Sequence, residues 1–306
     1  MKSLTADQVR LGFIGVGAMG SRIVRRLRDH AYQVAVYDRD HSKAVALLPY
    51  GASVVGSSTE LAANVDVILS CLTNDDAVCN VYLGFEGLLQ GIGKGKAILE
   101  MSTISPETSR EVYAQGGKRG VDVMDVAISG STPAVEQGTI TLLAGGDGEL
   151  FEAAAPIFQA LASQWFLMGP SGSGTSMKLV VNTILGVSMQ GIAEAVAVGE
   201  AEGLDRKRLL EVLSQTAVVA PAHKGKLARA ETGDYSSQFG IGMMNKDYRL
   251  ILDAARSSNL TLPATAAAYE VNSAALEDDP GADFSSVIRH MEKFIEVRVG
   301  TTKVVP

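Results

Sequence analysis

A glycine-rich loop near residue 15 constrains the fold of this chain more than any other feature. An apolar segment at residues 9–14 leads into Gly15-Val-Gly17-Ala-Met-Gly20, and an amphipathic segment then continues to about residue 29. Strand, Gly-x-Gly-x-x-Gly and helix in this order predict a dinucleotide-binding unit, in which the pyrophosphate lies at the helix N-terminus. The glycines permit the tight turn, the approach of the pyrophosphate and the packing of helix on strand, respectively. The residues predicted to bind the cofactor are Gly15, Gly17, Ala18, Met19 and Gly20.

The second predicted strand, residues 32–37, bears on the choice of cofactor. It ends at Asp38, 18 residues after Gly20. An acidic side chain at this place usually binds the ribose hydroxyls and favours NAD, whereas an arginine such as Arg39 can bind the 2′-phosphate of NADP. Asp38 and Asp40 would repel that phosphate, so the sequence favours NAD while leaving NADP open. The alternative interpretation of Asp38 is a simple cap at the end of the strand.

Strands and helices alternate through the first half of the chain. Further strands are predicted at 52–55, 65–72, 96–101, 121–127, 139–144 and 164–168. This alternation predicts an α/β fold with a Rossmann-type, doubly wound and mostly parallel sheet, whose ligands lie at the carboxyl ends of the strands. Three loops with small or polar residues follow such ends, at Leu72-Thr73, Ser102-Thr103 and Ser129-Gly130-Ser131. Leu72 and Thr73 are candidates for the cofactor, although ordinary turn chemistry also explains each loop taken singly.

The domain boundary is predicted at the break Gly169-Pro-Ser-Gly-Ser-Gly174. After it the pattern is helical throughout, with helices predicted at 174–203, 205–215, 221–232, 240–257, 263–277 and 283–295. A chain of 306 residues is long enough for two domains. We therefore predict a dinucleotide-binding domain at 1–169 and an all-helical domain at 170–306, which serves substrate binding and dimerisation.

The long helix predicted at 174–203 carries three residues of interest on one face. Gly174, Lys178 and Asn182 are spaced i, i+4 and i+8 along a helix that we expect to be buried almost all round. Because burial of an unpaired charge is costly, one hypothesis is that Lys178 is a general acid/base, with Asn182 beside it and Gly174 allowing a ligand to approach. The ordinary alternative is a lysine whose stem packs on apolar surface while its ammonium group reaches water. From the helix alone the ordinary alternative is favoured.

Composition narrows the class of protein. A net charge of −7, with no run of basic residues, argues against a nucleic-acid-binding face. Two cysteines are too few for a disulfide framework and suit a reducing compartment, and the scattered histidines predict no metal site. The apolar stretch at 178–200 contains Lys178, Asn182, Gln190 and Glu194 and is a poor membrane span, and residues 1–8 are polar. We expect a cytoplasmic protein without a membrane partner.

Four stretches in order give the chain a resemblance to a known family. They are Phe13-Ile-Gly15-Val-Gly17-Ala-Met-Gly20, Asp125-Val-Ala-Ile-Ser129-Gly130-Ser131 continuing to Gly138, Gly174-x-x-x-Lys178-x-x-x-Asn182, and Asn245-Lys246-Asp247 with Leu250. Over nearly its whole length the chain resembles the β-hydroxyacid dehydrogenases. It is most similar to the glyoxylate/succinic semialdehyde reductase and 3-hydroxyisobutyrate dehydrogenase branches. Ser129-Gly-Ser-Thr-Pro-Ala and Asp283-Phe-Ser285 are similar to the former.

The resemblance implies catalytic roles for residues of the long helix. The lysine matched by Lys178 is the acid/base of the family, and the asparagine matched by Asn182 binds the substrate or orients that lysine. The residues matched by Lys246 and Asp247 close over the site from the helical domain, the former towards the cofactor and the latter towards the substrate.

It also implies roles for the loops of the first domain. The Ser-Gly matched by Ser129 and Gly130, with Ser131 after it, holds the substrate carboxylate, and the threonine matched by Thr103 contacts both nicotinamide and substrate. Two departures from the family pattern stand out. Ala127 and Ile128 precede Ser129 where the family usually has a proline, and Asp38-Arg39-Asp40 replaces the Asn-Arg-Thr of the reductases, which puts a strict NADP preference in doubt.

These features together predict an oxidoreductase that moves hydride between a nicotinamide cofactor and a small hydroxy acid or aldehyde acid. The candidate substrates are 3-hydroxyisobutyrate, glyoxylate, succinic semialdehyde and tartronate semialdehyde. A lysine acts as a general base near neutral pH only where its surroundings lower its pKa from about 10.4. The alternatives are a catalytically inactive NAD(P)-binding scaffold or sensor, and an imine-reducing relative. A homodimer or homotetramer is expected, because the long apolar helix needs more cover than one helical domain supplies.

Overall fold

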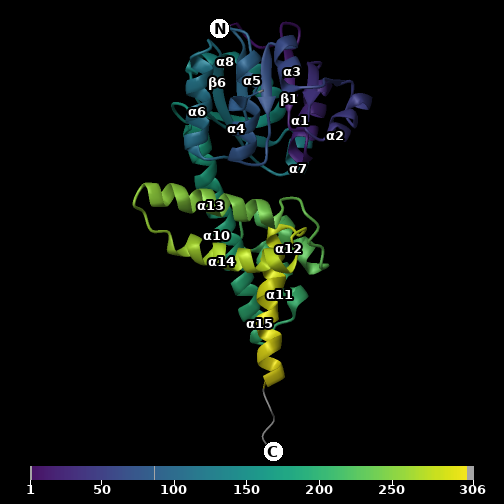
Figure 1. The fold of residues 1–306 in the computed structure, drawn as a ribbon. Coiled ribbons are helices and arrows are strands. Elements are labelled where there is room, and N and C mark those ends of the chain that lie inside the picture. Colours follow the sequence, from purple (N-terminus) through teal and green to yellow (C-terminus); the bar gives the residue numbers. More distant parts are fainter. Residues whose placement is uncertain (1, 86, 302–306) are drawn as a thin grey trace, which may run out of the picture. The chain divides into compact units, whose positions relative to one another are not determined.

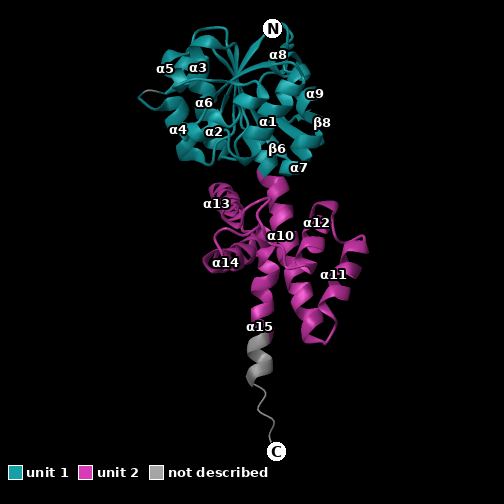
Figure 2. Cartoon of the chain, turned by 90° about the vertical axis from the view of Figure 1, so that its right-hand side faces the viewer, with its two compact units in different colours: residues 1–178 teal, residues 179–306 magenta. Residues whose placement is uncertain are grey.

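The computed structural model describes residues 2–85 and 87–301. Contacts divide the chain into two compact units, Met1–Lys178 and Leu179–Pro306 (Figure 2). The first is built around a sheet and the second is helical, and each is described separately below.

The sheet of the first unit has eight strands in the order β3-β2-β1-β4-β5-β6-β7-β8. Their bounds are β1 Arg10–Ile14, β2 Gln33–Tyr37, β3 Ser53–Val54, β4 Val67–Ser70, β5 Ala97–Glu100, β6 Asp122–Ser129, β7 Ile140–Gly145 and β8 Ala162–Leu167. Only the β6–β7 pair is antiparallel among these strands. The strand order reverses between β1 and β4, as in a doubly wound Rossmann sheet, and the predicted fold class is confirmed.

Helices cover both faces of this sheet (Figure 1). Their bounds are α1 Ala18–Asp29, α2 His41–Val45, α3 Ser58–Asn64, α4 Asp75–Leu83, α5 Leu88–Gly91, α6 Pro106–Gly117, α7 Thr132–Gln137, α8 Gly148–Ala153 and α9 Ala155–Leu161, with a 3₁₀ turn η1 at Leu48–Tyr50. Side chains that cap N-termini explain where several begin, since Asn74 accepts a hydrogen bond from Ala77 N–H in α4 and Ser105 accepts one from Thr108 N–H in α6. The helices α2, α5 and α7 were not predicted, because they are too short to show a helical period.

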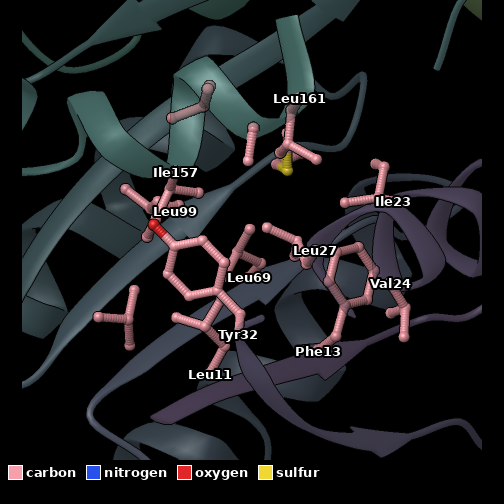
Figure 3. Close-up of a cluster of buried hydrophobic side chains, with 14 of the residues drawn as sticks. Leu11, Phe13, Ile23, Val24, Leu27, Tyr32, Leu69, Leu99, Ile157 and Leu161 are labelled. Atoms are coloured by element: carbon pink, nitrogen blue, oxygen red, sulfur yellow. The ribbon is translucent and has the colours of Figure 1, made fainter. Parts of the chain in front are cut away.

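The core of the first unit lies in two layers, one on each face of the sheet. In one layer α1 places Ile23, Val24 and Leu27 on the sheet, while its arginines are half-buried. Figure 3 shows Ile23, Val24 and Leu27 with Phe13 of β1 and with Leu161 of α9 in this cluster. The opposite layer packs α3, α4 and α5 on the same strands. Because both faces of the strands are buried, the strands are apolar almost without alternation.

The second unit consists of helices. Its elements are α10 Ser173–Ala201, which begins in the first unit, α11 Arg206–Gln215, α12 Pro221–Glu231, α13 Ile241–Ser257, α14 Pro263–Asp278, a 3₁₀ turn η2 at Phe284–Ser286, and α15 Val287–Thr301. Their bounds follow the predicted helices closely. A separate apolar cluster forms the core and includes Met189, Leu227, Met244 and Phe284.

The long helix α10 is buried along one face and not almost all round, so that expectation is wrong. Leu179, Asn182, Met189 and Val196 are buried at helical spacing, but Ile184 on the other side is 66% exposed. By length and composition α10 could cross a membrane, a test that core helices of soluble proteins also pass. The sequence shows an apolar composition on both sides, and only the packing shows which side is covered.

The N-terminus of α10 belongs to the first unit by its contacts. We predicted the domain boundary between residues 169 and 170, and the division of contacts falls after Lys178, about two turns into the helix. The reason is local. Asp125 of β6 accepts hydrogen bonds from the backbone N–H groups of Gly172 and Thr175, which fixes the first turn of α10 to the sheet.

Candidate active site

The three glycines of the 15–20 loop have three different surroundings. Gly15 has a φ of +87°, and a Cβ there would collide with the carbonyl oxygen of Cys71. A Cβ at Gly20 would collide with the carbonyl oxygen of Gly15, so the third glycine lets α1 pack on the turn. At Gly17 a Cβ would meet no described atom within 4 Å. The first and third glycines are therefore needed by the fold, whereas the second leaves open space for a ligand.

This open space lies at the N-terminus of a helix that offers free donors. Gly17 is the N-cap residue of α1, and among the described residues no side chain caps it and no acid lies in its first turn. Asp38, which follows β2, accepts Val16 N–H at 2.8 Å and Asp40 N–H at 2.9 Å, and so holds the loop after β2 against the glycine loop. Open space, unsatisfied helix N–H groups and a nearby carboxylate fit the pyrophosphate and ribose of a dinucleotide.

Replacing Gly17 by alanine is expected to separate cofactor binding from folding. The substitution adds a Cβ only to the open space, and the backbone φ of −67° suits alanine. We expect the Kd for NADH to rise about tenfold or more while the melting temperature stays unchanged. Fluorescence titration and thermal unfolding measure the two effects.

The matched control is Gly225→Ala in α12, where an added Cβ also meets no described atom within 4 Å. It should leave the Kd unchanged. A Gly17→Ala protein that binds NADH like the wild type would contradict the assignment of this space to the cofactor.

The other predicted loops of the first unit follow the carboxyl ends of neighbouring strands. Leu72 and Thr73 follow β4, Thr103 follows β5, and Ser129 is the last residue of β6. These strands pair in parallel with β1 or with one another, so their ends lie at the same edge of the sheet as the glycine loop.

The segment after β6 turns sharply before α7. Gly130 has a φ of +152°, which favours glycine, and a Cβ there would lie 2.7 Å from Ile140 Cγ2. Ser131 is the N-cap residue of α7. Ser129 is half-buried, while Gly130 and Ser131 are exposed, so the segment presents backbone and hydroxyl groups beyond the end of the strand. Those groups can donate hydrogen bonds to a small polar ligand or accept hydrogen bonds from it.

Lys178 and Gly174 stand on the part of α10 that is fixed to the sheet. Asp125 accepts Gly172 N–H at 2.7 Å, Thr175 N–H at 2.8 Å and the Thr175 hydroxyl at 3.2 Å. A Cβ at Gly174 would collide with the carbonyl oxygen of Leu143, so this glycine allows close packing on β7. We had connected Gly174 with ligand approach, and the packing supplies a structural reason instead. Lys178 follows one turn later and is half-buried.

In the second unit, Asn182 and Asp247 form a buried pair. Asn182 Nδ2 donates to Asp247 Oδ2 at 2.6 Å, and both residues are at most 1% exposed. Lys246 Nζ lies 3.0 Å from Asp247 Oδ1. Because a carboxylate only accepts here, the amide nitrogen of Asn182 must face Asp247, which leaves Asn182 Oδ1 buried and without a hydrogen-bond partner in the described part of the chain. That amide oxygen is therefore left with its capacity to accept a hydrogen bond.

Each unit thus gathers its own part of the predicted site. The first unit brings the glycine loop, Asp38 and the loops after β4, β5 and β6 to one sheet edge, and the second pairs Asn182 with Asp247. The sequence did not lead us to predict the structural roles of two buried acids, Glu100 and Asp125, which accept hydrogen bonds from neighbouring elements. Their signal was available, because an acid inside an otherwise apolar strand needs a partner.

This fold and this site define a class, the nicotinamide-dependent oxidoreductases with a Rossmann domain, and two family models agree. Residues 10–169 match the NAD binding domain of 6-phosphogluconate dehydrogenase. Residues 172–291 match the NAD-binding model of NADP-dependent 3-hydroxyisobutyrate dehydrogenase. The match therefore extends over both units.

Several proteins are similar to this chain over most of their length. The NAD-dependent L-serine dehydrogenase of Pseudomonas aeruginosa is 35% identical over 83% of this chain and 88% of the relative. Glyoxylate/succinic semialdehyde reductase 1 of Arabidopsis thaliana is 32% identical over 92% of this chain and 97% of the relative. Among solved structures, the 3-hydroxyisobutyrate dehydrogenase of Mycobacterium tuberculosis with L-serine has a TM-score of 0.84 at 26% identity, covering 92% of this chain and 99% of that one.

The chain belongs to the β-hydroxyacid dehydrogenase family. It is an NAD(P)-dependent oxidoreductase that acts on CH–OH groups of hydroxy acids.

Proposed function

We propose that the enzyme interconverts a small β- or γ-hydroxy acid, or glycolate, with the corresponding aldehyde acid, and that Lys178 is its general acid/base. The observation that supports this most directly is the pairing of Asn182 with Asp247 at 2.6 Å, which fixes a buried amide one turn after Lys178 on α10. An inactive scaffold would have no need for such a fixed amide beside a retained lysine.

The proposed reaction needs one proton acceptor and one carboxylate site. A bound nicotinamide supplies the hydride acceptor in oxidation and the hydride donor in reduction. In oxidation the neutral amine of Lys178 takes the hydroxyl proton of the substrate as the carbinol C–H bond breaks, and the carbonyl forms. In reduction the ammonium group returns that proton to the oxygen. Asn182, held by Asp247, orients the lysine or the substrate oxygen.

The loops of the first unit are proposed to orient the substrate. Ser129, Gly130 and Ser131 offer hydroxyl and backbone N–H groups, which suit a carboxylate. Thr103, after β5, is proposed to contact both nicotinamide and substrate. Lys246 and Asp247 are proposed to reach the cofactor and the substrate, respectively, from the second unit.

We propose NAD as the preferred cofactor, although NADP is kept as the alternative. Asp38 accepts one backbone N–H on each carboxylate oxygen, and each oxygen keeps a lone pair for a ribose hydroxyl. The hydroxyl of Ser42 donates a hydrogen bond to Asp40 at 2.6 Å and so holds this second carboxylate near Asp38. A negative charge at this place would repel the 2′-phosphate of NADP.

A substrate panel with both cofactors tests the proposal. The enzyme is assayed with 3-hydroxyisobutyrate and L-serine in oxidation, and with glyoxylate, succinic semialdehyde and tartronate semialdehyde in reduction, each with NAD and NADP species. We expect turnover of at least one hydroxy acid pair and a higher kcat/KM with the NAD species. Binding of NADH without turnover of any panel member would favour an inactive scaffold, and turnover of cyclic imines alone would favour an imine reductase.

We further propose that the enzyme self-associates through the exposed face of α10. Val180, Ile184 and Val198 are 52%, 66% and 64% exposed and lie on one side of the helix, with Gly191 and Ala195 between them. An exposed apolar stripe of this length is usually covered by a partner surface, and a second copy of the chain supplies an identical stripe.

The net charge of −7 supports a function without nucleic acid, and we propose a cytoplasmic protein without a membrane partner.

Replacing Ile184 by glutamate is expected to dissociate the oligomer. Sedimentation of the wild type should give a dimer or tetramer, and Ile184→Glu should shift it to the monomer, because a charge would be buried in the interface. Val218→Glu, at a residue that is 87% exposed and outside α10, should leave the oligomer intact. A monomeric wild type would remove the proposal.

A further inference from the structure

Four polar side chains are buried together below the ends of β4 and β5. Ser70, Tyr82, Glu100 and Ser102 are each at most 3% exposed, and we call them the Glu100 network. Glu100 Oε1 accepts Ser102 N–H at 3.0 Å and the Ser70 hydroxyl at 3.2 Å, and Ser70 Oγ lies 2.6 Å from the Tyr82 hydroxyl of α4. The network therefore joins β4, β5 and α4 through one carboxyl group.

The network ends at the loop that faces the glycine turn. Ser102 Oγ accepts Leu72 N–H at 2.7 Å, which links the loop after β5 to the loop after β4. A Cβ at Gly15 would lie 2.9 Å from Leu72 Cδ2, so Leu72 packs directly on the glycine turn. Thr73 and Thr103, proposed for the cofactor, are the next residues in the two loops. Glu100 itself is buried, so an effect on a ligand would have to pass through its hydrogen-bond partners.

We propose that Glu100 is a positioning residue for cofactor binding, which holds Ser102 and thereby the loops at Leu72 and Thr103 in their binding geometry, and which loosens them when it ionises. The inference rests on cofactor binding at this sheet edge, but not on the identity of the substrate.

The surroundings of Glu100 give the sign of the expected pH effect. Burial raises the pKa of Glu100 from its ordinary value of 4.5 to about 7, and the negative charge of Asp125 adds to this rise. The hydrogen bonds from Ser102 and Ser70 lower the pKa and offset part of the rise. The titratable groups that face it are Tyr82 from α4 and Asp125, its register partner in β6. Oε2 is buried and accepts no hydrogen bond in the described part of the chain.

Because the pKa of this acid is raised on folding, its ionisation destabilises the folded arrangement. The stabilising contribution of Glu100 is complete below its ordinary value of 4.5 and is lost as the pH rises through about 7. We expect the charge on Oε2, which has no hydrogen-bond partner in the described part of the chain, to draw water into the network and so to loosen the Ser102 link. The affinity for the cofactor should therefore be highest where Glu100 is protonated and should fall at higher pH.

Two variants and a control test the proposal by NADH fluorescence titration from about pH 6 to about pH 9. Glu100→Gln keeps an acceptor at the same place without a charge, so its Kd should match the wild type at about pH 6 and should not rise with pH, whereas the wild-type Kd should rise about threefold or more. Glu100→Leu removes the acceptor, so the KM for the cofactor should rise about tenfold while kcat at saturating cofactor stays within about threefold. Glu107→Gln, at an exposed acid of α6, should behave as the wild type.

The outcomes distinguish the alternatives. If Glu100→Gln follows the wild-type pH profile, or if Glu100→Leu folds and keeps the wild-type KM, Glu100 is structural only and the proposal is wrong. If Glu100→Leu does not fold, the pH profile of Glu100→Gln still decides. A wild type that binds no NADH would instead overturn cofactor binding at this edge, which is a separate failure.

Discussion

Replacing Lys178 by methionine is expected to lower kcat by about 10²–10⁴-fold, the usual contribution of a general acid/base. Methionine keeps the length and the apolar stem of the side chain but cannot exchange a proton. The first unit should still fold, because Asp125 and not Lys178 fixes the first turn of α10. Cofactor binding depends on the glycine loop and should stay close to that of the wild type.

Initial-rate assays, with NADH titration in parallel, measure the two effects separately. The kcat should fall in Lys178→Met while the Kd for NADH stays that of the wild type. Lys207→Met in α11, with a side chain that is 76% exposed, is the matched control and should keep full activity. Near-normal turnover by Lys178→Met would refute the acid/base role.

Replacing Asp125 by alanine is expected to cause a large loss of stability in the first unit. The change leaves the N–H groups of Gly172 and Thr175 buried without their acceptor, at a cost of about 1–3 kcal/mol for each group. The gain from no longer burying the carboxylate offsets part of this cost, because burial raises the pKa of Asp125 and its ionised form is disfavoured. We expect a net loss of about 3 kcal/mol and a melting temperature lower by several degrees.

Thermal unfolding of three variants tests this expectation. Asp125→Asn keeps one oxygen acceptor without a charge and should recover part of the stability. Asp122→Ala, on the same strand at an exposed position, should cost little. Asp125→Ala should also lower kcat more than it raises the KM for the cofactor, because it loosens the turn that precedes Lys178. An Asp125→Ala protein with the wild-type melting temperature would show that the hydrogen bonds at the start of α10 contribute little.

Much of the fold could be predicted because its signals are local. The glycine loop and the apolar strands are each recognisable from a few consecutive residues, and together they predict the sheet, while the helical pattern after residue 170 predicts the second unit. The prediction missed α5 and α7 because helices of four to six residues contain too few turns for a period to appear. Pro156 in the first turn of α9 marks the point where α9 begins as a helix separate from α8.

The candidate site was predicted residue by residue, but not how its residues are held. Gly174 and Gly17 are both candidate ligand-binding glycines in the sequence. In the structure, however, the carbonyl oxygen of Leu143 occupies the space that a Cβ at Gly174 would need, whereas Gly17 faces open space. Periodicity cannot distinguish these two cases, since the neighbours that decide them come from elsewhere in the chain.

Short-range spacing and residue type were enough to predict the strands in their order along the chain, the dinucleotide loop and the family. Three-dimensional packing was needed to show which face of α10 is buried, that Asp125 fixes the start of that helix, that Asn182 is bound by Asp247, and that Glu100 lies beneath the loops at Leu72 and Thr103. Each of these contacts joins residues from different elements. A buried acid takes its role from whichever donors the fold brings to it, and no local pattern specifies those donors.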